Sequence, residues 1–309
     1  MLHQRNFLSI LDFSLLETEY LVKRASELKV DQFSNALTTK NIVLLFEKPS
    51  LRTKVSFDIG IHQMGGHSLY MGAAEIGFET REPTSDIAKV LSRYAQGIVA
   101  RVNKHSSLVD LAKHSEIPII NALSDWEHPC QTMADLQTIN EAKQTLKGLT
   151  VAFIGDGNNV ARSLALGIAA TGSTFTIASP KNHDLDACTL NLARSMAAKH
   201  GTSILAVRDP QEAVQEADVV YTDVWTSMGQ ELESGERRFA FKGYTVSPEL
   251  MNHAKSKAIF MHDMPVHYGE EVTPDMLDHP NSVVLDQAEN RLHSQKAILE
   301  FLLTRTSVK

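Results

Sequence analysis

The regular alternation of short apolar runs with longer amphipathic segments constrains this chain more than any other feature. Runs such as Ile42–Phe46 and Thr150–Ile154 consist largely of apolar residues, and each is followed by a segment with helical spacing. Ser14 and Glu17 form a capping box, which predicts the start of one such helix. Strands that alternate with helices are typical of parallel sheets covered by helices, so the pattern predicts an α/β fold.

The pattern stops and restarts at a long predicted helix, from about Gln131 to Gln144. We therefore predict two doubly wound parallel-sheet domains joined by this helix, with residues 1–140 in the first and residues 141–288 in the second. A closing helix from about Glu289 to Leu303 is expected to pack back on the first domain, so residues 289–309 are assigned there. The remaining predicted strands are Ser68–Met71, Ile98–Val102, Ile117–Ile120, Thr174–Ala178, Ser203–Val207, Val219–Thr222, Ala258–Met261 and Val283–Leu285.

Length and composition exclude several classes of protein. The chain has 309 residues, of which 43% are hydrophobic and 22% are charged, as expected for two folded domains and not for a disordered chain. No apolar run reaches the roughly 18–20 residues of a membrane helix, and the N-terminal segment lacks the apolar core of a signal peptide. A net charge of −7 without a Lys/Arg block argues against nucleic acid. Cys130 and Cys188 form no disulfide framework, so we expect a reducing, cytoplasmic location.

The first segment with chemical potential lies between a predicted strand and a predicted helix, at Phe46-Glu47-Lys48-Pro49-Ser50-Leu51-Arg52-Thr53-Lys54. Free amide groups at a helix N-terminus favour an anion, and the Ser50 and Thr53 hydroxyls with the Arg52 guanidinium would complete a phosphate cradle. The spacing is not that of a Walker A loop. Taken alone, the segment is better explained by a helix cap beside a surface arginine.

A second segment, Gly155-Asp156-Gly157-Asn158-Asn159-Val160, resembles the start of a dinucleotide fingerprint. Val160 occupies the third glycine position, and the next predicted strand ends without an acidic residue for a ribose hydroxyl. NAD binding is therefore disfavoured. The two asparagines could instead bind a substrate carboxylate or amine, or the segment could be a plain strand–helix turn.

Three further polar segments follow predicted strands or begin predicted helices. His128 could polarise a carbonyl or supply a proton, whereas Cys130 is a candidate nucleophile only with a base nearby. Asp223 lies at the carboxyl end of a predicted parallel strand, where ligands bind in such sheets. His262, Asp263 and His267 match no standard metal spacing, so we expect no metal.

In this order and spacing, the segments resemble those of the ornithine carbamoyltransferase family over nearly the whole chain. The matching segments are FEKPSLRTKVSF, IVARVNKHS with Arg101, HPCQTMADL, GDGNNVARSL, DVWTSMGQE, HDMPVHYGEEVT and LDQAENRLHSQKAIL. The resemblance implies transfer of a carbamoyl group from carbamoyl phosphate to the side-chain amine of L-ornithine, without a cofactor. It also implies a homotrimer in which a loop near Gly72–Glu82 reaches a neighbour's phosphate site.

The resemblance also assigns site residues. It implies that carbamoyl phosphate contacts Ser50, Leu51, Arg52, Thr53, Arg101, His128, Gln131, Asp263, Met264 and Arg291. It implies that ornithine contacts Asn159, Asp223, Ser227 and Met228, and that Arg52, Arg101, His128 and Asp263 are catalytic. The chemistry agrees with this assignment, because carbamoyl phosphate is already activated and needs charge neutralisation, carbonyl polarisation and a positioned amine.

The chain departs from the family pattern most clearly at Asp263, where ornithine carbamoyltransferases typically have cysteine. A carboxylate there would favour the ammonium form of an acceptor amine, unless Asp263 itself works as the base. A carbamoyltransferase that acts on putrescine or an acylated ornithine is therefore a second hypothesis. The third is a NAD-dependent oxidoreductase, and the fourth is an inactive protein that senses carbamoyl phosphate.

Overall fold

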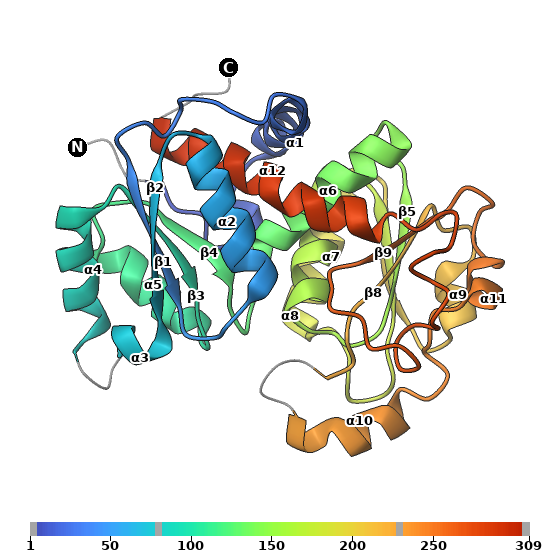
Figure 1. Ribbon diagram of the computed structural model, residues 1–309. Helices are drawn as coiled ribbons and strands as arrows, with labels where there is room; N and C mark the ends of the chain where they lie inside the picture. Colours follow the sequence, from blue (N-terminus) through green and yellow to red (C-terminus); the bar gives the residue numbers. More distant parts are fainter. Residues whose placement is uncertain (1–4, 78–81, 227–230, 305–309) are drawn as a thin grey trace. The chain divides into compact units, whose positions relative to one another are not determined.

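The structure is a computed structural model that describes residues 5–77, 82–226 and 231–304. The chain divides into two compact units (Figure 1). Unit 1 comprises residues 1–137 and 289–309, and unit 2 comprises residues 138–288.

Unit 1 contains a four-stranded parallel sheet in the order β2-β1-β3-β4. Its strands are β1 (Asn41–Phe46), β2 (His67–Gly72), β3 (Gly97–Arg101) and β4 (Ile119–Leu123). The chain runs from β1 outward to β2 and then returns to β3 on the other side of β1. The switch point of the topology, where ligands bind in open α/β sheets, therefore lies between the carboxyl ends of β1 and β3.

Helices cover this sheet, and the last helix returns to it as predicted. The helices are η1 (Ile10–Asp12), α1 (Leu15–Val30), α2 (Leu51–Gln63), α3 (Ala73–Ile76), α4 (Thr84–Tyr94), α5 (His105–His114) and the first part of α6 (Pro129–Lys143). The predicted capping box is present, since the Ser14 hydroxyl accepts a hydrogen bond of 3.3 Å from the Glu17 amide. α12 (Val284–Thr304) packs on α1, where Glu300 pairs with Arg24 at 3.1 Å (Figure 1). This confirms that the closing helix packs on the first domain.

Unit 2 contains a five-stranded parallel sheet in the order β7-β6-β5-β8-β9. Its strands are β5 (Thr150–Ile154), β6 (Thr174–Ala178), β7 (Ile204–Val207), β8 (Val219–Thr222) and β9 (Ile259–His262). Its helices are α7 (Asn159–Thr171), α8 (Ala187–Ala198), α9 (Pro210–Val214), η2 (Glu231–Glu233), α10 (Ser234–Ala240) and α11 (Pro248–Met251). The strand order reverses between β5 and β8, which confirms the doubly wound fold and places a second switch point there.

One predicted strand is wrong. The segment Val283–Leu285 forms no strand, because only Ser282 bridges Phe260 and α12 already begins at Val284. The Val283 amide donates to the Phe260 carbonyl at 3.0 Å, and the Val283 carbonyl then accepts from Gln287 as the helix starts. Three apolar residues are too few to distinguish a strand from the buried first turn of a helix. Among the described residues, no helix is both long and apolar enough to cross a membrane.

Candidate active site

The anion-binding loop predicted after β1 lies at the switch point of unit 1. Ser50 is the N-cap of α2, and its hydroxyl accepts a hydrogen bond of 3.3 Å from the Thr53 amide. Leu51 and Arg52 form the first helical turn, so their amide groups have no acceptor within the helix and favour an anion. Within the described residues, the half-buried Arg52 guanidinium has no hydrogen-bond or ion-pair partner.

Arg291 connects three segments of unit 1 through hydrogen bonds from its guanidinium. Nη2 donates to the Thr53 hydroxyl at 2.8 Å, and Nη1 donates to Gln131 Oε1 at 2.8 Å. The Gln131 amide in turn donates to Asp135 Oδ1 at 2.9 Å. All four side chains are buried, so the position of the Arg291 charge is fixed by packing and by these bonds. Asp135 was not predicted as part of the site.

His128 lies near two buried arginines. Arg101 ends β3 opposite Phe46 of β1, and His128 precedes the first turn of α6. Burial, together with the Arg291 and Arg101 charges, holds the pKa of His128 well below its ordinary value. The imidazole is therefore neutral at physiological pH, which favours a hydrogen-bonding role over that of a proton donor.

Cys130 does not fit the role of a nucleophile that sequence left open. Its thiol is fully buried and donates a hydrogen bond of 3.2 Å to the Asn121 carbonyl. Burial raises the pKa of this thiol to about 12, although the Arg291 charge acts in the opposite direction. Because only the thiolate is a strong nucleophile, Cys130 is a structural residue of the α6 N-terminus.

In unit 2, Asp223 follows β8 at the second switch point and is held by a residue of the other loop. Asn158 Nδ2 donates to Asp223 Oδ2 at 2.7 Å, and the Val224 amide donates to Oδ1 at 2.6 Å. The side-chain oxygen Oδ1 of Asn158 accepts from the Val160 and Ala161 amides at the start of α7, so this side chain both caps the helix and orients Asp223. Asn159 begins α7 and is half-buried. The predicted residues Ser227 and Met228 lie outside the described residues.

The packing around the glycine-rich turn disfavours a dinucleotide. A Cβ atom on Gly157 would lie 2.2 Å from the Leu185 amide nitrogen, so backbone of this chain already occupies the space beside that glycine. At the end of β6, Ser179 donates its hydroxyl to the Gly155 carbonyl at 2.6 Å. The turn is therefore built for close packing within unit 2, and β6 is followed directly by Ser179 and Pro180 instead of by an acidic residue for a ribose hydroxyl.

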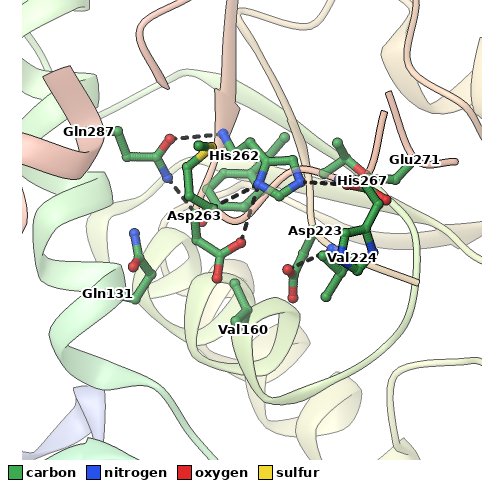
Figure 2. Close-up of polar contacts among 12 residues, drawn as sticks. Gln131, Val160, Asp223, Val224, His262, Asp263, His267, Glu271 and Gln287 are labelled. Atoms are coloured by element: carbon green, nitrogen blue, oxygen red, sulfur yellow. Dashed lines mark hydrogen bonds and ion pairs between the residues drawn. The ribbon is translucent and has the colours of Figure 1, made fainter. Parts of the chain in front are cut away.

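The His262–Met264 turn after β9 is fixed by a buried carboxylate (Figure 2). His262 Nδ1 accepts a hydrogen bond of 2.9 Å from the Met264 amide, so Nε2 carries the proton and donates to Glu271 Oε1 at 3.2 Å. The His262 amide donates to Gln287 Oε1 at 2.8 Å. Two groups thus hold this imidazole, which has no exposed surface, and Gln287 holds the backbone of the same residue. Neither Glu271 nor Gln287 was predicted, although Glu271 lies within the HDMPVHYGEEVT segment.

Asp263 and Asp223 directly follow the ends of two neighbouring strands that pair in register. Thr222 of β8 pairs in register with His262 of β9, and each is followed by one of the two aspartates. The Asp263 carboxylate lies 3.7 Å from His262 Nδ1 and its side chain is 11% exposed. Figure 2 shows both carboxylates on the side of the turn that faces Val160 of α7. Two carboxylates at one sheet edge favour a cationic ligand.

The second histidine of this segment, His267, lies near two glutamates. Ligand atoms of His267, Glu270 and Glu271 lie within 4.8 Å of one another. Both carboxylates already have partners, because Glu270 pairs with Arg238 at 2.8 Å and Glu271 accepts from His262 and from the His267 amide. The geometry therefore gives these carboxylates structural roles in the turn.

Known proteins resemble the chain over almost its full length. The family model described as the aspartate/ornithine carbamoyltransferase carbamoyl-P binding domain matches residues 5–141, and that of the Asp/Orn binding domain matches residues 147–302. An ornithine carbamoyltransferase of Thermococcus kodakarensis is 46% identical over 303 residues, covering 97% of this chain and 96% of the relative.

Solved structures agree with these matches. Ornithine carbamoyltransferase from Pyrococcus furiosus superposes with a TM-score of 0.95 at 44% identity, covering 99% of both chains. The anabolic enzyme from Campylobacter jejuni superposes with a TM-score of 0.94 at 36% identity, covering 98% of this chain and 100% of that one. With both family models matched and these identities over nearly the full length, the chain belongs to the aspartate/ornithine carbamoyltransferase family.

Proposed function

We propose that this protein is an ornithine carbamoyltransferase of arginine biosynthesis, which converts carbamoyl phosphate and L-ornithine into L-citrulline and phosphate. The observation that carries the proposal is the buried group of Arg291, Arg101 and neutral His128 at the switch point of unit 1. Membership of the family and the names of the relatives support it.

The loop at the start of α2 and the arginines are assigned to the phosphate. The hydroxyls of Ser50 and Thr53, the amide of Leu51, and the guanidinium groups of Arg52 and Arg101 would neutralise and orient it. Arg291 is held by Thr53 and Gln131 before any ligand binds. A charge that needs no rearrangement stabilises the developing phosphate more effectively than a mobile one.

His128 is assigned to the carbonyl oxygen of the carbamoyl group. Attack by the amine nitrogen forms a C–N bond and pushes negative charge onto this oxygen, and the C–O bond to phosphate then breaks. A neutral imidazole can donate one hydrogen bond to that oxygen without giving up its proton. The low pKa of His128 therefore supports its role as an electrostatic stabiliser.

Unit 2 is assigned to the amino acid. Asp223 would accept hydrogen bonds from the α-ammonium group, and Asn159 would bind the carboxylate, with Ser227 and Met228 completing the site. Asp263, one residue beyond β9, and the Met264 backbone would lie beside the reacting groups. The Asp263 carboxylate is the proposed acceptor for the proton that the amine loses during attack.

The reaction requires no metal and no organic cofactor in this proposal, because carbamoyl phosphate brings its own leaving group. Every step is the work of hydrogen bonds, fixed charges and one proton acceptor. Cytoplasmic location stays a prediction from the sequence.

The homotrimer expected from the sequence is supported by an exposed apolar stripe on unit 1. Val55 and Ile59 lie one helical turn apart on α2 and are each 43% exposed. Exposed apolar patches mark interaction surfaces, and a symmetric oligomer would bury this one. Ile59→Asp should lower the mass measured by sedimentation, whereas Val109→Asp, at an exposed position of α5, should not.

A product assay tests the proposed activity. Carbamoyl phosphate is supplied with ornithine, putrescine, acetylornithine, lysine or aspartate in turn, and the carbamoylated products are separated and quantified. Citrulline from ornithine alone supports the proposal. Turnover only with another amine would retain the carbamoyltransferase mechanism and make Asp263 the source of a different specificity, and no turnover with any amine would contradict the proposal.

A further inference from the structure

A buried ion pair connects the two loops that meet at the switch point of unit 2. Asp156 lies in the turn after β5, and its carboxylate accepts a hydrogen bond from Arg237 Nη2 of α10. The side chains are 12% and 6% exposed. Neither residue was predicted as part of a site, although Asp156 belongs to the GDGNN segment.

Arg237 also holds the chain immediately beyond Asp223. Its Nε donates to the carbonyl of Trp225, two residues after Asp223, while its Nη2 reaches Asp156. The Trp225 ring stacks on Phe241 with centroids 5.5 Å apart, and the Arg237 guanidinium lies 5.6 Å from the same Phe241 ring. One guanidinium thus ties the loop after β8 to the turn after β5 and to α10.

The charged side chains around Asp156 interact electrostatically with Asp223. Burial is the largest cause that raises the pKa of Asp156, Arg237 and His183 oppose it, and the Asp223 carboxylate adds to the increase. His183 Nδ1 lies 3.6 Å from Asp156 Oδ1, on the other side of the carboxylate from Arg237. Asp223 therefore lies close enough to this group for its electrostatic environment to depend on the ion pair.

We propose that Arg237, fixed by Asp156, is a positioning residue that sets the place of Asp223 and of the segment Val224–Trp225 for the acceptor amino acid. The inference rests on the proposed assignment of Asp223 to the acceptor. Among the described residues, the hydrogen bonds and ion pairs of Arg237 are made to residues of unit 2, whereas the residues assigned to the phosphate belong to unit 1. Loss of Arg237 should therefore raise the KM for the acceptor and leave the KM for carbamoyl phosphate nearly unchanged.

The test compares Arg237→Met with Arg238→Met, which removes the neighbouring arginine of the same helix. Arg238 is a matched control because it is 60% exposed and pairs with Glu270 instead. In Arg237→Met the KM for ornithine should rise roughly 10- to 150-fold, the range expected from loss of a charge-assisted hydrogen bond. The KM for carbamoyl phosphate should change by less than about twofold, and Arg238→Met should resemble wild type in both constants.

A double variant separates positioning from stability. Removing one partner of a buried pair leaves an unpaired charge, so Arg237→Met should also lower the melting temperature, and adding Asp156→Asn should restore part of it. The ornithine KM should remain raised in the double variant, because the Trp225 carbonyl still lacks its donor. Recovery of KM together with stability, or equal effects on both substrates, would overturn the proposal.

The wild-type enzyme keeps this test distinct from that of the proposed function. If wild type uses another amine, the same KM comparison is made with that amine. A raised KM for that amine in Arg237→Met would then support the positioning role, and an unchanged KM would contradict it. Arg237→Lys adds a graded variant, since lysine keeps the charge but cannot reach two acceptors with a planar fork. Its acceptor KM should lie between those of wild type and Arg237→Met, and a value equal to that of Arg237→Met would contradict a charge contribution.

Discussion

Arg291 and Thr53 lie 238 residues apart in the sequence, yet Arg291 Nη2 donates a hydrogen bond of 2.8 Å to the Thr53 hydroxyl. The contact joins the last helix of the chain to the first turn of α2, within unit 1. It places a buried guanidinium beside a helix N-terminus that already favours an anion. The folding of α12 onto unit 1 thereby completes the proposed phosphate site.

The first prediction concerns this guanidinium. Arg291→Lys keeps a positive charge but lacks the planar fork whose two nitrogens donate to Thr53 and Gln131, so the KM for carbamoyl phosphate should rise by about 10-fold or more. Steady-state kinetics with each substrate varied in turn measures the effect. Arg24→Lys is the control, because Arg24 of α1 pairs with Glu300, which lies on α12 as Arg291 does. This variant should leave both KM values unchanged. An unaltered carbamoyl phosphate KM in Arg291→Lys would contradict the assignment.

The second prediction concerns stability and pH at His128. The folded protein holds the pKa of His128 well below 6.5, whereas the unfolded chain has the ordinary value. As pH falls below about 6.5, the unfolded chain binds a proton at His128 that the folded protein does not bind. The free energy of unfolding therefore falls, by at most about 1.4 kcal/mol per pH unit for one group. Urea unfolding between pH 7.5 and 5 measures this slope.

His128→Gln should reduce that slope, because glutamine does not titrate. His200→Gln is the control for the substitution itself, since it removes a histidine that is exposed just beyond α8. Equal slopes in wild type and His128→Gln would mean that His128 binds its proton in the folded protein as readily as in the unfolded chain.

Much of the fold could be predicted from local patterns. Ser14 with Glu17 predicted the start of α1, and apolar runs predicted the strands whose carboxyl ends carry Arg101 and Asp223. Within each parallel sheet the carboxyl ends of the strands lie at one edge. A polar residue directly after a strand is therefore a usable signal for a site. Val283–Leu285 shows the limit, because a short apolar run fits a buried helix start as well as a strand.

The partners of the site residues could not be predicted in the same way. Glu271 orients His262 from nine residues away, and Arg237 reaches Asp156 across 81 residues. Such pairs depend on which loops fold against each other, and a charged residue in a loop or short helix looks the same in sequence whether it is exposed or buried. The only local signal was composition, since Asp156 and Glu271 both lie within polar segments that contain predicted site residues.

The third prediction concerns the two cysteines. Cys188 is exposed, whereas Cys130 is buried with a pKa raised to about 12. Iodoacetamide at pH 8 should therefore alkylate Cys188 and leave Cys130 unmodified in the folded enzyme, with activity retained. Peptide mass spectrometry locates the label, and Cys188→Ser gives the unlabelled control. Rapid labelling of Cys130 with loss of activity would restore it as a candidate nucleophile.

The last prediction concerns Asp263, which stands beside Asp223 at the end of β9. If its carboxylate accepts the proton of the attacking amine, Asp263→Asn should lower kcat by about 100-fold or more while changing the ornithine KM less. Asp263→Cys should keep turnover of ornithine but move the rise of kcat to higher pH, because a thiol ordinarily ionises near pH 8.5 and a carboxyl group near pH 4. Profiles of kcat against pH for the three proteins measure both effects.

A kcat within about threefold of wild type in Asp263→Asn would exclude the base role, because general-base catalysis contributes about 100-fold or more. Asp263 would then act only through its charge on the choice of amine.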